Sequence, residues 1–186
     1  MRILVELPTW LGDTVMTTPA IENLVNFHND SEVVLIGSSA SIEIFKNHPN
    51  VSKIHVLDKR YLSLFSLARR LGSFDKFISF RDTIRSVFFQ LFISSRDKFR
   101  FKRRDFQNCH QVEKYNNFIN KSLKTEFSAG ELIIYSDNSL KEKSNVTRKK
   151  LPMLGINPGA SYGSSKRWYP EEFANVAAKL SSQYAI

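Results

Sequence analysis

Short apolar runs alternate with stretches of helical spacing along most of the chain. The runs predict buried strands, and the stretches between them repeat apolar residues every three or four positions, as on one face of a helix. The predicted strands are residues 3–7, 32–36, 54–57, 76–80 and 132–135, with another around Phe99 and Phe101. The first predicted helix begins at Asp13, and four more cover residues 41–47, 61–71, 83–93 and 112–123. This alternation predicts an α/β fold with a mostly parallel, doubly wound sheet, whose ligand crevice lies beyond the carboxyl ends of the strands.

The pattern breaks at residues 136–150 and then restarts. That stretch, SDNSLKEKSNVTRKK, holds almost no apolar residues and is typical of a linker. A predicted strand, a Gly- and Ser-rich loop and a predicted helix follow over 151–156, 157–168 and 170–184. We therefore expect one domain over residues 1–135 and, over 151–186, the start of an incomplete second domain, because one strand and one helix cannot enclose a core.

Composition narrows the class of protein. The 186 residues are 42% hydrophobic and 24% charged, which is ordinary for a globular chain and unlike a disordered one. No apolar run approaches the roughly 18 residues that a membrane helix needs, and the N-terminus lacks the pattern of a signal peptide. Cys109 is the only cysteine, so neither an intramolecular disulfide nor a Cys-x-x-Cys site is present. These features point to the cytoplasm.

The positive charge is concentrated in one stretch. The chain has a net charge of +9, and residues 59–104 hold thirteen Lys or Arg against three Asp or Glu. Such a block is either a solvated face or an anion-binding surface. Nucleic acid, an acidic membrane surface and a phosphorylated substrate all remain open as partners at this point.

Asp13 is the first candidate for chemistry. It follows Gly12 in the loop after the first predicted strand, where it could cap the next helix. The same position faces the expected crevice, where a general base would act, and the two roles are compatible. Pro19 weakens the first turn of this helix or moves its start towards Thr18.

The loop over 157–168 is a candidate phosphate cradle. Gly159 and Gly163 allow close backbone approach, while Lys166 and Arg167 bring positive charge to the start of the following helix. The loop matches neither G-x-x-x-x-G-K-[ST] nor G-x-G-x-x-G, so a flexible loop with solvated charges is an equal alternative.

The basic stretch contains two further candidate features. Arg81 and Arg85 lie one helical turn apart just after a predicted strand, and arginine binds phosphate or carboxylate through two parallel hydrogen bonds. Phe99, Phe101 and Phe106 alternate with basic residues, as on a base-stacking platform. A strand with one buried aromatic face is the interpretation that we favour. His110 either caps the helix that follows it or lines the crevice.

Two segments resemble one enzyme family. ILVELPTWLGDTVMTTPAI, over residues 3–21, and GINPGASYGSSKRWYPEEFANVAAKL, over 155–180, are similar to the starts of the two halves of glycosyltransferase family 9, the ADP-heptose:lipopolysaccharide heptosyltransferases. SFRDTIRS and HQVEKY are weaker matches between them. The sequence Trp-Leu-Gly-Asp at residues 10–13 most resembles the branch of the family that adds the second heptose.

The resemblance implies a fold and a set of roles. The fold would be the GT-B arrangement of two Rossmann-like domains, of which the first binds the acceptor and the second the ADP-sugar. The reaction would invert the anomeric centre without metal, cofactor or nucleic acid, which fits the lack of an Asp-x-Asp triplet. By resemblance, Asp13 is the general base, Gly12, Ser161 and Lys166 bind the donor ADP-heptose, and Arg81 and Arg85 face an anionic inner-core acceptor. The enzyme would lie at the cytoplasmic face of the inner membrane.

Length is the main departure from the family, whose members are roughly twice as long. The resemblance therefore implies a truncated chain that is inactive by itself and associates through residues 151–186. The alternatives are a basic domain that binds nucleic acid or a membrane surface, and a family-9 transferase for another sugar. A crevice that brings the basic residues together with Asp13 would favour the enzyme.

Overall fold

The computed structural model describes residues 1–57, 61–135, 151–160 and 163–185. The chain divides into two compact units, Met1–Ser136 and Asp137–Ile186, which are described separately. No helix within the described ranges has the length and apolar character needed to cross a bilayer.

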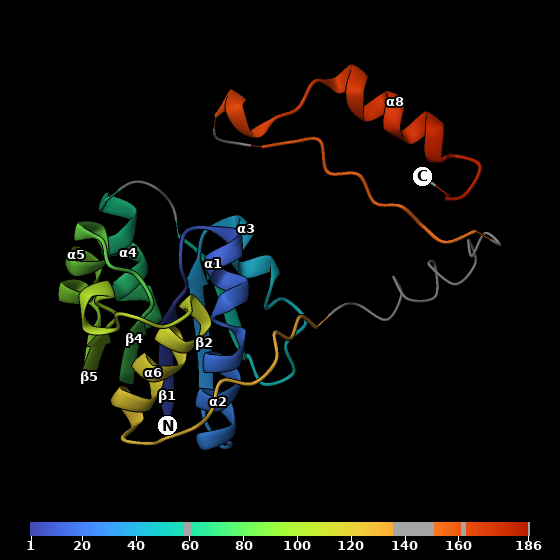
Figure 1. Cartoon of the computed structure of the whole chain (residues 1–186). Coiled ribbons are helices and arrows are strands. Elements are labelled where there is room, and N and C mark those ends of the chain that lie inside the picture. Colours follow the sequence, from blue (N-terminus) through green and yellow to red (C-terminus); the bar gives the residue numbers. More distant parts are fainter. Residues whose placement is uncertain (58–60, 136–150, 161–162, 186) are drawn as a thin grey trace. The chain divides into compact units, whose positions relative to one another are not determined.

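A five-stranded parallel sheet forms the centre of the first unit (Figure 1). The strands lie in the order β3-β2-β1-β4-β5, and their bounds are β1 (Arg2–Glu6), β2 (Glu32–Gly37), β3 (Lys53–Val56), β4 (Ser73–Ser79) and β5 (Ser94–Arg100). Val5 of β1 pairs with Leu35 on one side and with Ile78 on the other. The predicted α/β class with a parallel, doubly wound sheet is confirmed. From β1 the chain adds β2 and β3 on one side of the sheet and then β4 and β5 on the other. The strand order therefore reverses between β1 and β4, and such folds bind ligands at this point.

Helices cover both faces of this sheet. On one face, the side chains of α2 (Thr18–Phe27) and α6 (Gln111–Leu123) join those of β1 and β2 in a core that includes Ile21, Leu35 and Phe118. On the other face, α4 (Tyr61–Leu71) and α5 (Ile84–Phe92) pack over Leu4 and Phe77. The short helices α1 (Leu11–Met16) and α3 (Ser39–Glu43) follow β1 and β2. The central strands β1 and β2 are therefore buried from both sides, which explains their nearly continuous apolar sequences, whereas the edge strands β3 and β5 have no buried residue.

The aromatic residues of the basic stretch are largely internal. Phe101 is buried and stacks on Phe106 with ring centroids 5.7 Å apart, and both rings also contact Phe118. Phe99 is partly buried against the same core. This confirms a strand with one buried aromatic face and removes the surface that stacked bases would need.

Local hydrogen bonds explain where several helices begin. Thr83 Oγ1 accepts from the Ser86 amide at the start of α5, at 3.3 Å. His110 and Glu113 form a capping box at the start of α6, in which each side chain accepts from a backbone amide near the helix start. Of the two roles considered for His110, the structure gives it the cap.

The predicted cap at Asp13 is wrong. Trp10 is the residue that precedes α1, and Asp13 lies within the first turn of that helix. A second helix, α2, starts at Thr18 with Pro19 near its beginning. The proline needs no amide partner there, so the chain forms two short helices where one was predicted.

The predicted strand over 132–135 is also wrong. Residues 126–135 have no regular structure, and their backbone is held by helix side chains instead. Asn116 Nδ2 donates to the Phe127 carbonyl at 2.6 Å, and the Ile133 amide donates to Thr18 Oγ1 at 3.2 Å. Side chains of α2 and α6 thus supply the hydrogen bonds that a neighbouring strand would otherwise give.

The second unit contains η2 (Ser164–Lys166) and α8 (Pro170–Leu180), which ends earlier than predicted. The predicted strand over 151–156 is wrong, since only a single parallel bridge joins Met153 to Ala185. A strand needs a partner along its length, and the described part of this unit offers none. None of the described residues of this unit is buried.

Candidate active site

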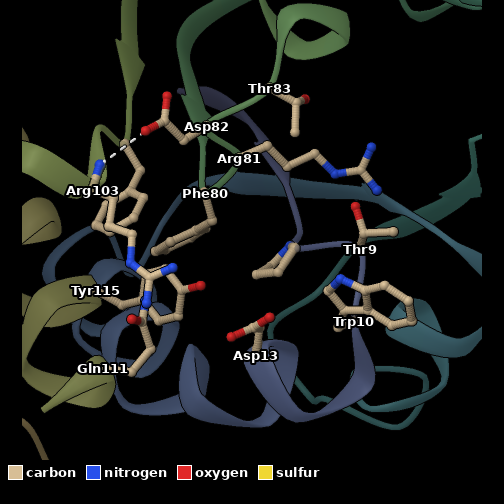
Figure 2. Close-up of a pocket in the computed structure, with 12 residues that line it drawn as sticks. Thr9, Trp10, Asp13, Phe80, Arg81, Asp82, Thr83, Arg103, Gln111 and Tyr115 are labelled. Atoms are coloured by element: carbon tan, nitrogen blue, oxygen red, sulfur yellow. Dashed lines mark hydrogen bonds between the residues drawn. The ribbon is translucent and has the colours of Figure 1, made fainter. Parts of the chain in front are cut away.

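A pocket of about 330 Å³ opens at the carboxyl ends of β1 and β4. The loops after β1, β4 and β5 and the first turns of α1 and α6 contribute its walls (Figure 2). Its lining residues are Pro8, Thr9, Trp10, Asp13, Phe80, Arg81, Asp82, Thr83, Phe101, Arg103, Gln111 and Tyr115. The pocket therefore lies between β1 and β4, where the strand order reverses and where folds of this class bind their ligands.

Asp13 enters this pocket from α1 and is half-buried. The buried Thr14 fixes the turn that carries it, because Thr14 Oγ1 donates to the Trp10 carbonyl at 3.0 Å and lies 3.4 Å from that of Pro8. Asp13 forms no salt bridge with any residue that the structure describes. Its carboxylate is thus available to a ligand at the place where a general base is needed.

Tyr115 faces Asp13 across the pocket (Figure 2). Burial and, after it, the negative charge of Asp13 raise the pKa of the Tyr115 hydroxyl to about 12. A hydrogen bond with Gln111 and the positive charge of Arg103 act against this pKa shift. Tyr115 therefore stays protonated at neutral pH and offers a hydrogen-bond donor beside the carboxylate.

Arg103 supplies positive charge at the exposed rim. Its amide donates to Asp82 Oδ2 at 3.1 Å, and Arg100 Nη1 lies 3.4 Å from Asp82 Oδ1. Asp82 thereby holds the chain after β5 beside the loop after β4. Figure 2 shows the Arg103 side chain passing beside Phe80 towards Gln111 and Tyr115.

Arg81 also lines the pocket, but its guanidinium is committed to the protein. Its Nε donates to the Leu7 carbonyl at 2.9 Å, its Nη1 lies 3.6 Å from Glu6 Oε1, and 7% of the side chain is exposed. Burial lowers the pKa of Arg81, while the Glu6 carboxylate raises it. Figure 2 shows Arg81 reaching towards Thr9, away from Asp13. The residue joins the ends of β1 and β4, the two strands that flank the pocket.

A buried carboxylate lies behind the pocket, and the sequence analysis did not find it. Glu6 is 1% exposed and its Oε2 accepts from Ser79 Oγ at 2.7 Å and from Ser86 Oγ at 2.6 Å. Ser79 Oγ also accepts from the Arg81 amide. The available signal was an acidic residue inside the apolar run ILVEL, since an acid in a buried strand needs partners.

No group of three or more His, Cys, Asp or Glu side chains in the described ranges is placed to hold a metal ion. The ionisable groups that line the pocket are two carboxylates, Asp13 and Asp82, the neutral phenol of Tyr115, and the guanidinium groups of Arg81 and Arg103.

Comparison with known proteins decides the family. The sequence model of glycosyltransferase family 9 (heptosyltransferase) matches residues 64–186, more than half of the chain. The chain belongs to glycosyltransferase family 9. The resemblance seen in the sequence is confirmed, although this match begins after the loop that carries Asp13.

Two family-9 proteins match the whole chain, including that loop. Both are lipooligosaccharide heptosyltransferase 2 of Campylobacter jejuni subsp. jejuni, 36% identical in serotype O:2 and 35% identical in serotype O:6. The chain spans 58% and 59% of the lengths of these two relatives.

Solved family-9 structures share the fold. The glycosyl transferase family 9 protein of Veillonella parvula matches 97% of this chain with a TM-score of 0.78 at 22% identity, and 60% of its own chain is covered. ADP-heptose LPS heptosyltransferase II of E. coli matches 99% with a TM-score of 0.72 at 18% identity, and 62% of that chain is covered. The Rossmann-like class, as the N-terminal part of a GT-B glycosyltransferase, is confirmed.

The structure brings together only some of the residues that the family resemblance singled out. Asp13 and Arg81 line one pocket, whereas Arg85, on α5, is not among its lining residues. Gly12 is exposed in the first turn of α1, and a Cβ there would meet nothing within 4 Å. Lys166 belongs to the second unit, and Ser161 lies outside the described residues.

Proposed function

We propose that the protein transfers heptose from ADP-heptose to the inner core of lipopolysaccharide, with Asp13 as the general base. The observation that carries this proposal is the half-buried Asp13 carboxylate in a pocket at the carboxyl edge of the sheet. Membership of family 9 and the names of the matched heptosyltransferases supply the sugar and the acceptor. The first domain would hold the acceptor.

In the proposed step, an acceptor heptose hydroxyl attacks the anomeric carbon of the donor. The new carbon–oxygen bond forms on the face opposite the departing diphosphate, ADP leaves with the electron pair, and the configuration inverts. Asp13 takes the hydroxyl proton as the nucleophile attacks. No metal is required in this scheme, because the transferred proton and the leaving diphosphate are each met by side chains.

Other pocket residues position the acceptor. Tyr115, protonated at neutral pH, donates a hydrogen bond to an acceptor oxygen near Asp13. Arg103 attracts the phosphates and carboxylates of the inner core, because guanidinium groups pair well with both. Arg81 acts mainly by fixing the pocket wall, and Arg85 adds positive charge from α5.

The donor is bound by the second domain in this proposal. Lys166, in η2, is exposed and would contact the diphosphate, with Ser161 and Gly12 as further donor contacts. The acceptor is a lipid, so the enzyme would act in the cytoplasm at the inner-membrane surface.

The test replaces Asp13 by asparagine, which keeps the size of the side chain and removes the base. Release of ADP from ADP-heptose is followed with a heptosyl-Kdo-lipid A acceptor in the complete protein. We expect Asp13→Asn to lower turnover about 10²–10⁴-fold, the usual scale for a general base, with donor affinity unchanged. Asp30→Asn, at an exposed acid before β2, is the matched control and should leave turnover intact.

Equal turnover by Asp13→Asn and the wild type would contradict the assignment of the base. Faster turnover with another ADP-sugar than with ADP-heptose would instead retain the chemistry and change the sugar.

A further inference from the structure

The outward face of α5 carries a row of exposed apolar side chains. Ile84 is 76% exposed and Leu91 is 70% exposed, and they lie two turns apart on the same side of the helix. The other exposed apolar residues of this face are Val87, Phe88 and Phe92. Positions 84, 87, 88, 91 and 92 follow the spacing of a continuous helical stripe.

This stripe is not the face that holds α5 to the sheet. Ser86, Phe89 and Ile93 are buried on the opposite side, where Phe89 contacts Phe77. The helix is thus apolar on both sides, a pattern that normally accompanies burial on both sides. A contiguous exposed apolar surface of this kind marks an interaction site.

The surface extends onto the neighbouring helix α4. Phe65 of α4 is exposed and meets Phe92 edge to face at 5.3 Å, and Arg69 lies over the Phe65 ring at 5.7 Å. We call the outer residues of the two helices, Phe65, Ile84, Val87, Phe88, Leu91 and Phe92, the α5 face. Figure 1 shows α4 and α5 side by side, with no other helix of the first unit outside them.

Positive charge borders the α5 face. Residues 84–104 carry seven Lys or Arg and one Asp. Beside α5, a second pocket of about 450 Å³ is lined by Lys98, Arg100, Lys102 and Lys121 together with Gln90 of α5. Lys98 Nζ donates to the Gln90 carbonyl at 2.8 Å, which places this ammonium group one residue from Leu91.

We propose that the α5 face docks the protein onto a bilayer of anionic phospholipid, with its aliphatic side chains inserted at the interface and the bordering cations on the headgroups. Apolar side chains flanked by Lys and Arg are what an interfacial helix requires, because insertion and electrostatic attraction add. The inference rests on the proposed function only in that a lipid acceptor requires a membrane.

Nucleic acid fits the same surface less well. Base stacking needs exposed aromatic rings along a basic track. The α5 face does expose the rings of Phe65, Phe88 and Phe92, but its two most exposed side chains, Ile84 and Leu91, are aliphatic and suit insertion into lipid better than stacking. The aromatic rings Phe101 and Phe106 within the basic stretch are packed in the core.

The experiment measures co-sedimentation of the whole chain with vesicles of phosphatidylcholine alone or mixed with phosphatidylglycerol. The test variant is Ile84→Ser with Leu91→Ser, which removes two exposed side chains and leaves the core intact. The matched control is Val56→Ser, a 54% exposed apolar residue on β3 at the opposite edge of the sheet. Circular dichroism confirms that both variants fold.

We expect the wild type and Val56→Ser to bind the anionic vesicles, and added salt to weaken this binding. The double variant should bind at least about tenfold more weakly, because it loses two inserted aliphatic side chains. In the protein used for the Asp13 test, the same substitutions should leave transfer to a water-soluble, delipidated acceptor unchanged, so that loss of docking is distinguished from loss of catalysis.

Three results would overturn the docking surface. The first is equal vesicle binding by the double variant and the wild type, and the second is no binding by the wild type. The third is a dimer, or a complex with single-stranded DNA, that the double substitution disrupts while vesicle binding is unchanged. Each would leave the Asp13 proposal untouched.

Discussion

At the scale of single residues, the pocket depends on charges that are coupled across short distances. Asp13 and Tyr115 influence each other, since the Asp13 carboxylate raises the pKa of the Tyr115 hydroxyl. Behind them, Glu6 and Arg81 form a buried pair that carries no exposed function of its own. The first pair is placed to accept hydrogen bonds from, and donate them to, an acceptor hydroxyl in the proposed reaction. The second pair stabilises the wall of the pocket.

Removing the charge of Asp13 should lower the pKa of Tyr115. In the folded protein this pKa is about 12, raised by burial first and by Asp13 second. Asp13→Asn removes only the second cause, so we expect a pKa that stays above the ordinary value of 10 but falls below about 12. A titration of the Tyr115 ring carbon by NMR measures it, with Asp30→Asn as the control that leaves it unchanged. An unchanged pKa in Asp13→Asn would show that the two groups are not coupled.

Neutralising Glu6 should destabilise the fold. Glu6→Gln keeps an oxygen to accept from Ser79 and Ser86 but leaves the buried guanidinium of Arg81 without its counter-charge. Loss of one partner of a buried ion pair lowers the free energy of unfolding by roughly 3–5 kcal/mol, and we expect this loss in Glu6→Gln. Urea denaturation measures it. Glu43→Gln, which breaks an exposed pair with Lys46, is the control and should cost less than about 1 kcal/mol. Similar losses in the two variants would argue against a role for Glu6 in the wall.

At the scale of elements, the helices depend on local signals that hold their ends. The capping box of His110 and Glu113 starts α6, the helix that carries Gln111 and Tyr115 into the pocket. These two hydrogen bonds fix where the first turn of α6 begins. The position of Tyr115 therefore depends in part on a residue outside the pocket lining.

Replacing His110 by alanine should cost about 1 kcal/mol of stability, because it removes the side chain that accepts from the Val112 amide. Thermal unfolding in comparison with Gln107→Ala, an exposed residue before the helix, measures the loss. Equal melting temperatures for the two variants would show that the cap contributes nothing.

The central strands β1 and β2 were predictable because each is buried on both faces and is therefore an apolar run. The edge strand β5 was predictable only from the alternation of Phe99 and Phe101 with basic residues, because its burial is partial. The strand over 132–135 was predicted as an apolar run and failed, because Ile133 and its neighbours bond to side chains of α2 and α6 rather than to a strand.

Asp13 was placed correctly at the crevice but wrongly as a helix cap, since Trp10 already ends the loop. Tyr115 was not predictable as a site residue, because its importance comes from which elements the fold brings beside it. Glu6 carried a signal, as an acid inside an apolar run, but its partners Ser79, Ser86 and Arg81 could be identified only from the fold.

At the scale of the whole molecule, stability resides in the first unit. Both clusters of buried apolar side chains lie within it, and the described residues of the second unit include none that is buried. The residues to which we assign roles are spread over both units, since the pocket that contains Asp13 belongs to the first unit and Lys166, our proposed donor contact, belongs to the second.

Residues 1–135 made alone should fold and keep the melting temperature of residues 1–186. We expect the two to differ by no more than about 4 °C, because none of the removed residues that the structure describes is buried. Differential scanning calorimetry of both chains is the measurement, and residues 1–135 should also keep vesicle binding, since the α5 face lies within them. An unfolded or aggregated shorter chain would mean that the second unit supports the first.

The edge position of β5 gives its basic residues one further consequence. An open strand edge is a template on which another chain can pair, and a parallel sheet has two such edges. Arg96, Lys98 and Arg100 occupy alternate positions along β5, so a second copy that approached edge to edge would bring like charges into register. The row of cations therefore discourages sheet-to-sheet aggregation, and it would do so most where docking on a membrane, as we propose, brought copies of the protein close together.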